Sequence, residues 1–216
     1  MTTLKPLSKG EFVALMAALA ATVAVSIDAM LPALPEIAAS LSPDAPNRAQ
    51  LVVTSFVFGI GLGTLFAGPL SDAFGRKVMI LAGSSLYIAA AIACYFANSL
   101  DFLLIARVVQ GFGAAFPRIV SIALMRDMFK GREMAKVMSF VMMVFALVPA
   151  VAPLMGQAVI SVLSWQAIFL VYIGFAAITM IWLWLRQPET LAVEARRPLA
   201  VGKLISATRE VLSHRI

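Results

Sequence analysis

The sequence predicts an all-α polytopic membrane protein built as a bundle of six transmembrane helices. Two observations carry this expectation: 62% of the 216 residues are hydrophobic, and only 13% are charged. A soluble domain has about 45–50% apolar and about 25% charged residues. So few charges cannot cover a water-facing surface, and the mean hydropathy of +0.95 agrees with lipid as the solvent.

Six stretches are long enough to cross a bilayer, since a spanning helix needs about 20 mostly apolar residues. Their apolar runs are continuous, whereas strands of a membrane barrel alternate. The first stretch is not a cleaved signal peptide, because it carries Asp28 and five more spans follow it. The predicted spans are residues 11–33, 50–70, 78–98, 101–125, 136–158 and 166–185.

The connections divide the chain into a bundle, residues 1–185, and a linker, residues 186–216. Residues 34–49 are expected to form an outer loop in which Ser42 resembles an N-cap. In the linker, apolar residues recur at helical spacing over about 199–213. This pattern predicts a short amphipathic helix, lying on the inner membrane surface or packed on protein.

Positive charges predict the orientation of the bundle. With both termini in the cytoplasm, 14 of the 17 lysines and arginines fall in inner segments, only Arg48 lies outside, and two lie within a span. This distribution follows the positive-inside rule. The net charge of +6 is therefore a topology signal, and no nucleic-acid partner is expected.

Three charged residues lie inside predicted spans, where each costs about 2.5–3.5 kcal/mol on insertion scales. Asp28 lies in the outer part of the first span; Arg107 and Arg118 lie in the fourth, about three helical turns apart. Gln110 falls on nearly the same face. We expect these four residues to line a water-accessible path that exchanges protons. The alternatives are ion pairs that only fix packing, or snorkelling of Asp28 and Arg118 to opposite interfaces.

The fifth span contains Pro149, Pro153 and Gly156. Prolines free backbone carbonyls in a spanning helix, and glycine permits close approach of a neighbour. The pattern fits either a packing kink or a gating element.

Enzymatic chemistry is not expected. His214 is the only histidine and lies near the end of the chain, and the sequence has neither a nucleophile elbow nor a phosphate-binding loop. A single cysteine, Cys94, excludes a disulfide framework and a cysteine-rich metal site.

Several motifs resemble the major facilitator superfamily. "GPLSDAFGRK" (68–77) is similar to the loop between spans 2 and 3, of form G-x-L-[AS]-D-x-x-G-R-[KR], and "ARVVQGFGAA" to the span-4 pattern R-x-x-Q-G-x-G. "DAMLPALPEIAASL", "MRDMFKGRE" and "PET" resemble the Bcr/CflA branch of the drug:proton antiporters with twelve spans. The span-5 motif G-P-x-x-G-G is matched imperfectly, because Ala152 and Gln157 replace two glycines.

The resemblance implies the N-terminal half of a fold that joins two six-span bundles, each of two inverted three-helix repeats. A second bundle, from the rest of a longer protein or from another chain, is the implied partner. The resemblance assigns Arg107 and Asp28 to proton coupling. It assigns Asp72 to capping a helix of the second bundle, and pairs Arg76 with Asp127. The expected inner-gate residues are Gly68, Asp72, Gly75, Arg76, Lys77 and Asp127.

The function expected from this resemblance is proton-coupled efflux of small amphiphilic compounds, driven by the proton gradient without a cofactor. The expected location is a bacterial inner membrane. A transporter of sugars, amino acids or siderophores with the same fold is an alternative. So is a truncated half that transports nothing.

Overall fold

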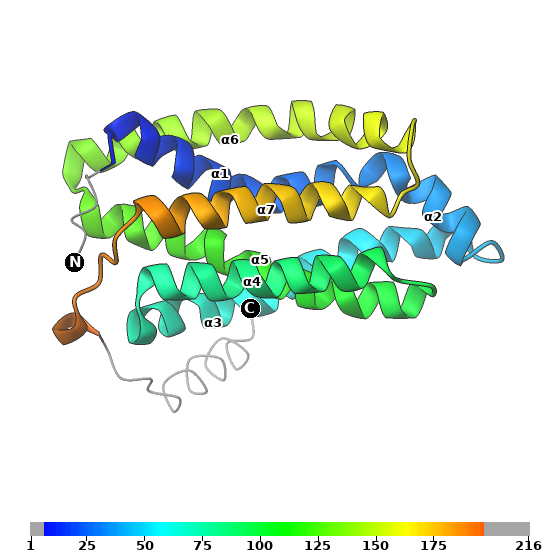
Figure 1. Ribbon diagram of the computed structural model, residues 1–216, viewed down its shortest axis with the longest axis horizontal. Helices are drawn as coiled ribbons and strands as arrows, with labels where there is room; N and C mark the ends of the chain where they lie inside the picture. The colour runs from blue at the N-terminus through cyan, green and yellow to red at the C-terminus, as the bar shows by residue number, and fades with distance from the viewer. Residues whose placement is uncertain (1–6, 197–216) are drawn as a thin grey trace, which may run out of the picture.

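The computed structural model describes residues 7–196, and six of its helices are long and apolar enough to cross a membrane (Figure 1). Within this range the chain is helical and contains no strand. The expected all-α bundle is confirmed. The amphipathic helix predicted at about 199–213 lies outside the described residues. The six long helices are α1 (Lys9–Asp28), α3 (Leu51–Phe74), α4 (Arg76–Tyr95), α5 (Leu100–Met128), α6 (Gly131–Ile160) and α7 (Ala167–Arg186).

The first span is not one continuous helix, and the expected loop at 34–49 is wrong. After α1 ends, the chain forms a short 3₁₀ turn, η1 (Leu31–Ala33), then α2 (Leu34–Leu41) and a second 3₁₀ turn, η2 (Pro46–Gln50). Pro32 and Pro35 are the second residues of η1 and α2, within the first turn of each. Proline is favoured there because its missing N–H has no intrahelical acceptor to lose. Ser42 follows α2 as its C-cap.

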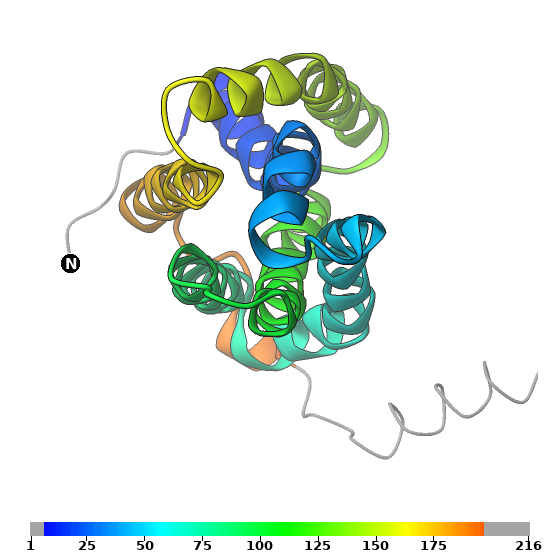
Figure 2. The same cartoon turned by 90° about the vertical axis from the view of Figure 1, so that its right-hand side faces the viewer.

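Helices α1 and α5 lie in the middle of the bundle, with α3, α4, α6 and α7 around them (Figure 2). In the span that contains α1, 67% of the most apolar 18-residue stretch is buried inside the bundle. The corresponding share is 17% for α6 and 28% for the span that contains α3. The second long helix of each half packs on the first helix of the other half: α3 on α5, and α6 on α1. This exchange is the arrangement of two three-helix repeats wound around a common centre.

Small residues allow the α3–α5 contact to be close. A Cβ atom placed on Gly63 of α3 would lie 2.6 Å from the Phe112 carbonyl oxygen and 2.7 Å from the Ala115 Cβ of α5. Membrane helices associate without a hydrophobic driving force between them, so close backbone packing carries much of the interaction. The crossing therefore depends on the missing side chain of Gly63.

Polar contacts fasten both ends of the bundle. At the end that holds the α3–α4 connection, here called the inner end, Arg186 of α7 donates two hydrogen bonds of 2.8 and 2.9 Å to Glu11 of α1. At the outer end, Arg48 of η2 pairs with Asp101 of α5 at 3.0 Å. The helices between the two ends are joined through apolar packing and one buried polar cluster.

Candidate functional site

The buried polar cluster is centred on the break in the first span. In a continuous helix the Ser26 carbonyl would accept from the amide of Met30, four residues on. That amide instead donates to Ile27, at 3.2 Å. The Ser26 carbonyl is thereby free for other donors, and it accepts from Arg107 Nη2 at 3.0 Å and from the Tyr172 hydroxyl at 3.2 Å.

Arg107 lies at the centre of this cluster with no exposed surface. Its Nε donates to the Val52 carbonyl of α3 at 3.1 Å, and its Nη1 to Gln110 Oε1 at 2.8 Å. The guanidinium carbon lies 4.2 Å from the centre of the Phe56 ring. None of the five ion pairs within residues 7–196 involves Arg107. Its charge is solvated by backbone carbonyls, an amide and a ring face.

Two tyrosines complete what we call the Arg107 cluster: Ser26, Tyr87, Arg107, Gln110 and Tyr172. The Ser26 and Tyr87 hydroxyls are 2.6 Å apart, and both tyrosines are buried. Ser26 and the two tyrosines are not among the site residues predicted from the sequence. A signal was present, because a tyrosine inside a span needs a partner for its hydroxyl. The cluster joins α1, α4, α5 and α7 at one point, and Arg107 adds α3 through the Val52 carbonyl.

The structure brings together only part of the predicted proton path. Arg107 and Gln110 meet in the cluster, and Asp28 is the last residue of α1, half-buried and two residues beyond Ser26. Arg118 is exposed and lies about 16 Å further along α5, at 1.5 Å per residue. The residues that hold Arg107 do not include Asp28 or Arg118.

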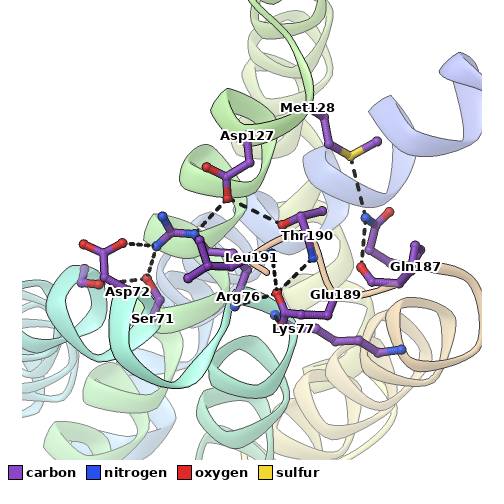
Figure 3. Close-up of polar contacts among 12 residues, drawn as sticks. Ser71, Asp72, Arg76, Lys77, Asp127, Met128, Gln187, Glu189, Thr190 and Leu191 are labelled. Atoms are coloured by element: carbon purple, nitrogen blue, oxygen red, sulfur yellow. Dashed lines mark hydrogen bonds and ion pairs between the residues drawn. The ribbon is translucent and has the colours of Figure 1, made fainter. Parts of the chain in front are cut away.

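A second cluster lies at the inner end, where Gly75 alone separates α3 from α4 (Figure 3). Arg76, the first residue of α4, is only 8% exposed. Its Nη1 pairs with Asp72 and donates to Ser71 Oγ at 2.6 Å, and its Nε donates to Asp127 Oδ2 of α5 at 3.0 Å. The pairing of Arg76 with Asp127 expected from the sequence is present.

The neighbouring motif residues have separate roles in the structure. Gly75 adopts a φ of +106°, a conformation that L side chains rarely adopt, so the one-residue turn requires glycine. Lys77 Nζ donates to the Trp184 carbonyl of α7 at 2.8 Å. Among the described residues, a Cβ atom added to Gly68 would meet no other atom within 4 Å, so packing does not require glycine there. A depression of about 430 Å³ lies beside the Asp72–Arg76–Asp127 ion pairs, between α3 and α5.

The proline-containing fifth span is the continuous helix α6, which passes through Pro149 and Pro153. Pro149 is exposed and Pro153 half-buried. Gly156 is buried against the end of α1, where a Cβ atom would overlap the Ala29 carbonyl oxygen. This glycine therefore sets the close approach of α6 to the break in the first span.

A metal centre has no support in the part of the chain that the structure describes. There, no three His, Cys, Asp or Glu side chains gather as a metal ion would require. Cys94 is buried and its Sγ lies 3.9 Å from Gln110 Oε1.

The chain is similar in sequence to two resistance proteins and in fold to one solved transporter. It is 38% identical over 178 residues to the bicyclomycin resistance protein homolog of Haemophilus influenzae, covering 82% of this chain and 44% of the relative. It is 36% identical over 146 residues to the chloramphenicol resistance protein of Pseudomonas aeruginosa, covering 67% and 35%. The xylose transporter XylE from E. coli matches with a TM-score of 0.76 at 13% identity, covering 94% of this chain and 56% of XylE.

These matches agree with the family model. The chain spans less than half the length of the two sequence relatives, and about half of the solved transporter. The model that describes the Major Facilitator Superfamily matches residues 14–216. This chain therefore belongs to the major facilitator superfamily, a family of membrane transporters, and covers the N-terminal half of its fold.

Proposed function

We propose that this chain forms the N-terminal half of a proton-coupled exporter of amphiphilic, drug-like compounds in a bacterial inner membrane. It works with a second six-span bundle by alternating access, with the proton gradient as its energy source and both termini in the cytoplasm. The relatives support the substrate class, since they are named for resistance to bicyclomycin and chloramphenicol.

The observation that carries the proposal is the buried charge of Arg107. A charged side chain in a membrane core is expensive and normally pairs with another charge or lines a cavity. Arg107 is fully buried, and the groups that hold it are carbonyls of Ser26 and Val52 and the amide of Gln110. A guanidinium kept in this way maintains a positive field at the centre of the bundle, where a carboxylate or a substrate can respond to it.

Asp28 is the proposed proton carrier. It is the last residue of α1, and the carbonyl two residues before it is held by Arg107. Its carboxylate is half-buried, so both its charged and its neutral form are accessible as the surroundings change. Protonation removes a negative charge near the break in the span. The electrostatic contribution to the contact between the end of α1 and α6 then changes.

The inner-end cluster is the proposed gate. Asp72 is 42% exposed at the rim of the depression between α3 and α5. A helix N-terminus of the second bundle, docked there, would be attracted to its carboxylate. A charge at an exposed helix end contributes only about 0.3–1 kcal/mol, so such a contact can form and break during each cycle.

Drug efflux in cells tests this proposal. The protein as encoded by its gene is expressed in a susceptible host, and tolerance and accumulation are measured for bicyclomycin, chloramphenicol and ethidium. We expect tolerance to at least one compound to rise several-fold, with efflux abolished by a protonophore. Unchanged tolerance and accumulation across the panel would refute the exporter.

Variants of Arg107 connect efflux to the cluster. Arg107→Lys keeps the charge but not the planar fork that reaches three acceptors at once. We expect it to reduce efflux strongly at normal membrane levels of the protein. Arg132→Lys, on the exposed first turn of α6, is the matched control. Full efflux by Arg107→Lys would contradict the role given to the cluster.

A further inference from the structure

The segment that follows α7 reaches back to the gate, chiefly through the side chain of Glu189 (Figure 3). Its Oε1 accepts from the backbone amide of Arg76 at 2.9 Å, and its Oε2 from the amide of Lys77 at 3.1 Å. The same Oε1 accepts from the amides of Thr190 and Leu191, at 2.9 and 3.1 Å. The carboxylate therefore caps the first turn of α4 and orders its own segment.

The turn before α4 is shaped to receive this carboxylate. A Cβ atom on Gly75 would lie 2.5 Å from Glu189 Oε2. Any other residue at position 75 would collide with the cap as well as strain the turn. Unsatisfied amides at a helix N-terminus favour an anion, both by hydrogen bonding and through the helix dipole. Gly75 thus leaves the space in which the Glu189 carboxylate, more than 100 positions later in the chain, reaches the first amides of α4.

We infer that Glu189 is a positioning residue of the inner gate. It holds the backbone of Arg76, whose side chain pairs with Asp72 and Asp127. The next residue, Thr190, places its hydroxyl 3.5 Å from Asp127 Oδ2. This inference rests on the proposed transport function, because the cluster is a gate only in a transporter. The linker that leaves the bundle is then mechanically joined to the gate, and its movement changes the geometry of the ion pairs.

Amide hydrogen exchange, resolved to single residues, tests the cap in the full protein in lipid nanodiscs. Glu189→Ala should speed exchange at Arg76 and Lys77 about fivefold, as expected for losing a typical cap. Glu189→Gln keeps one oxygen, and the Oε1 position satisfies three of the four amides. In Glu189→Gln, amide hydrogen exchange should therefore speed up at Lys77 and much less at Arg76. Glu194→Gln, exposed on the same segment, is the control and should change neither.

A double-mutant cycle tests whether Glu189 acts through Arg76. Melting temperatures are measured for Glu189→Gln, Asp127→Asn and the pair. If Glu189 positions Arg76, the melting temperature of the double variant falls clearly less than the sum of the two single decreases. The reason is that both changes weaken the same ion pairs. Glu189→Gln combined with Glu36→Gln at the outer end should be additive.

Two results would overturn the inference: unchanged exchange at both amides in Glu189→Ala, or additive losses with Asp127→Asn. Neither measurement uses transport. If the wild-type protein exports nothing, the transport proposal fails on its own, while exchange and coupling still decide the role of Glu189.

Discussion

Replacing Gly63 by alanine should separate α3 from α5. The new Cβ would lie 2.6 Å from the Phe112 carbonyl oxygen, about 0.8 Å short of an ordinary contact of 3.4 Å, and 2.7 Å from the Ala115 Cβ. Both opposing atoms belong to a helix or point directly from it, so neither can rotate away. The helices must move apart, and overpacking of this kind costs about 1–3 kcal/mol.

Gly61→Ala on the same helix is the matched control, because nothing lies within 4 Å of its added Cβ. Both variants gain the same helix propensity, about 1 kcal/mol relative to glycine. The difference between them therefore isolates the clash. At about 2–4 °C per kcal/mol for a chain of this size, a cost of about 1–3 kcal/mol means that Gly63→Ala should melt about 2–12 °C below Gly61→Ala.

The assay is thermal unfolding of both variants in the same detergent, followed by helical circular dichroism and by loss of the monodisperse peak. Equal melting temperatures would refute the α3–α5 packing described above. A lower melting temperature for Gly61→Ala would refute it more strongly, since that change meets open space.

Three further predictions concern the proposed site. Asp28→Asn should abolish protonophore-sensitive efflux and leave the melting temperature near that of the wild type. The exposed loop variant Asp44→Asn is the control and should retain efflux. Full efflux by Asp28→Asn would rule out the role of Asp28 as proton carrier. Arg76→Lys should slow efflux strongly, because an ammonium cannot bridge two carboxylates and a hydroxyl in the same plane, and in the same efflux assay Arg132→Lys should match the wild type. Gly156→Ala should lower the melting temperature by several degrees, because its Cβ overlaps a carbonyl at the end of α1; an unchanged value would contradict the close α1–α6 approach.

The helices could be predicted from the sequence because their signal is local. A run of about 20 apolar residues is sufficient, and six such runs are present as helices. The break in the first span could not be predicted in this way, because prolines at 34–49 are equally typical of a loop. In the structure Pro32 and Pro35 begin new helical turns, a role that their fixed φ also favours.

The site could be predicted only in part. The glycine turn at Gly75 depends on local sequence, and the pairing of Arg76 with Asp127, 51 residues apart, was expected only through the family resemblance. The partners of Arg107 come from three helices, and helical periodicity does not report which carbonyl a guanidinium reaches. Periodicity placed Arg118 on nearly the same face as Arg107, yet packing leaves it exposed.

Glu189 shows the same limit at longer range. The letters "PET" resemble the family but indicate no role for Glu189, because its contact partner precedes it by 113 residues. Only the fold, which brings the end of α7 beside the start of α4, gives this carboxylate a function.

Proton movement coupled to drug transport tests the central claim most directly. Everted membrane vesicles that contain the full protein are acidified by respiration, and the internal pH is followed with a fluorescent dye while bicyclomycin, chloramphenicol or ethidium is added. A proton-coupled exporter predicts that a transported compound releases protons from the vesicles and that Asp28→Asn abolishes this release. No proton release with any of the three compounds, or an equal release by Asp28→Asn, would contradict the account.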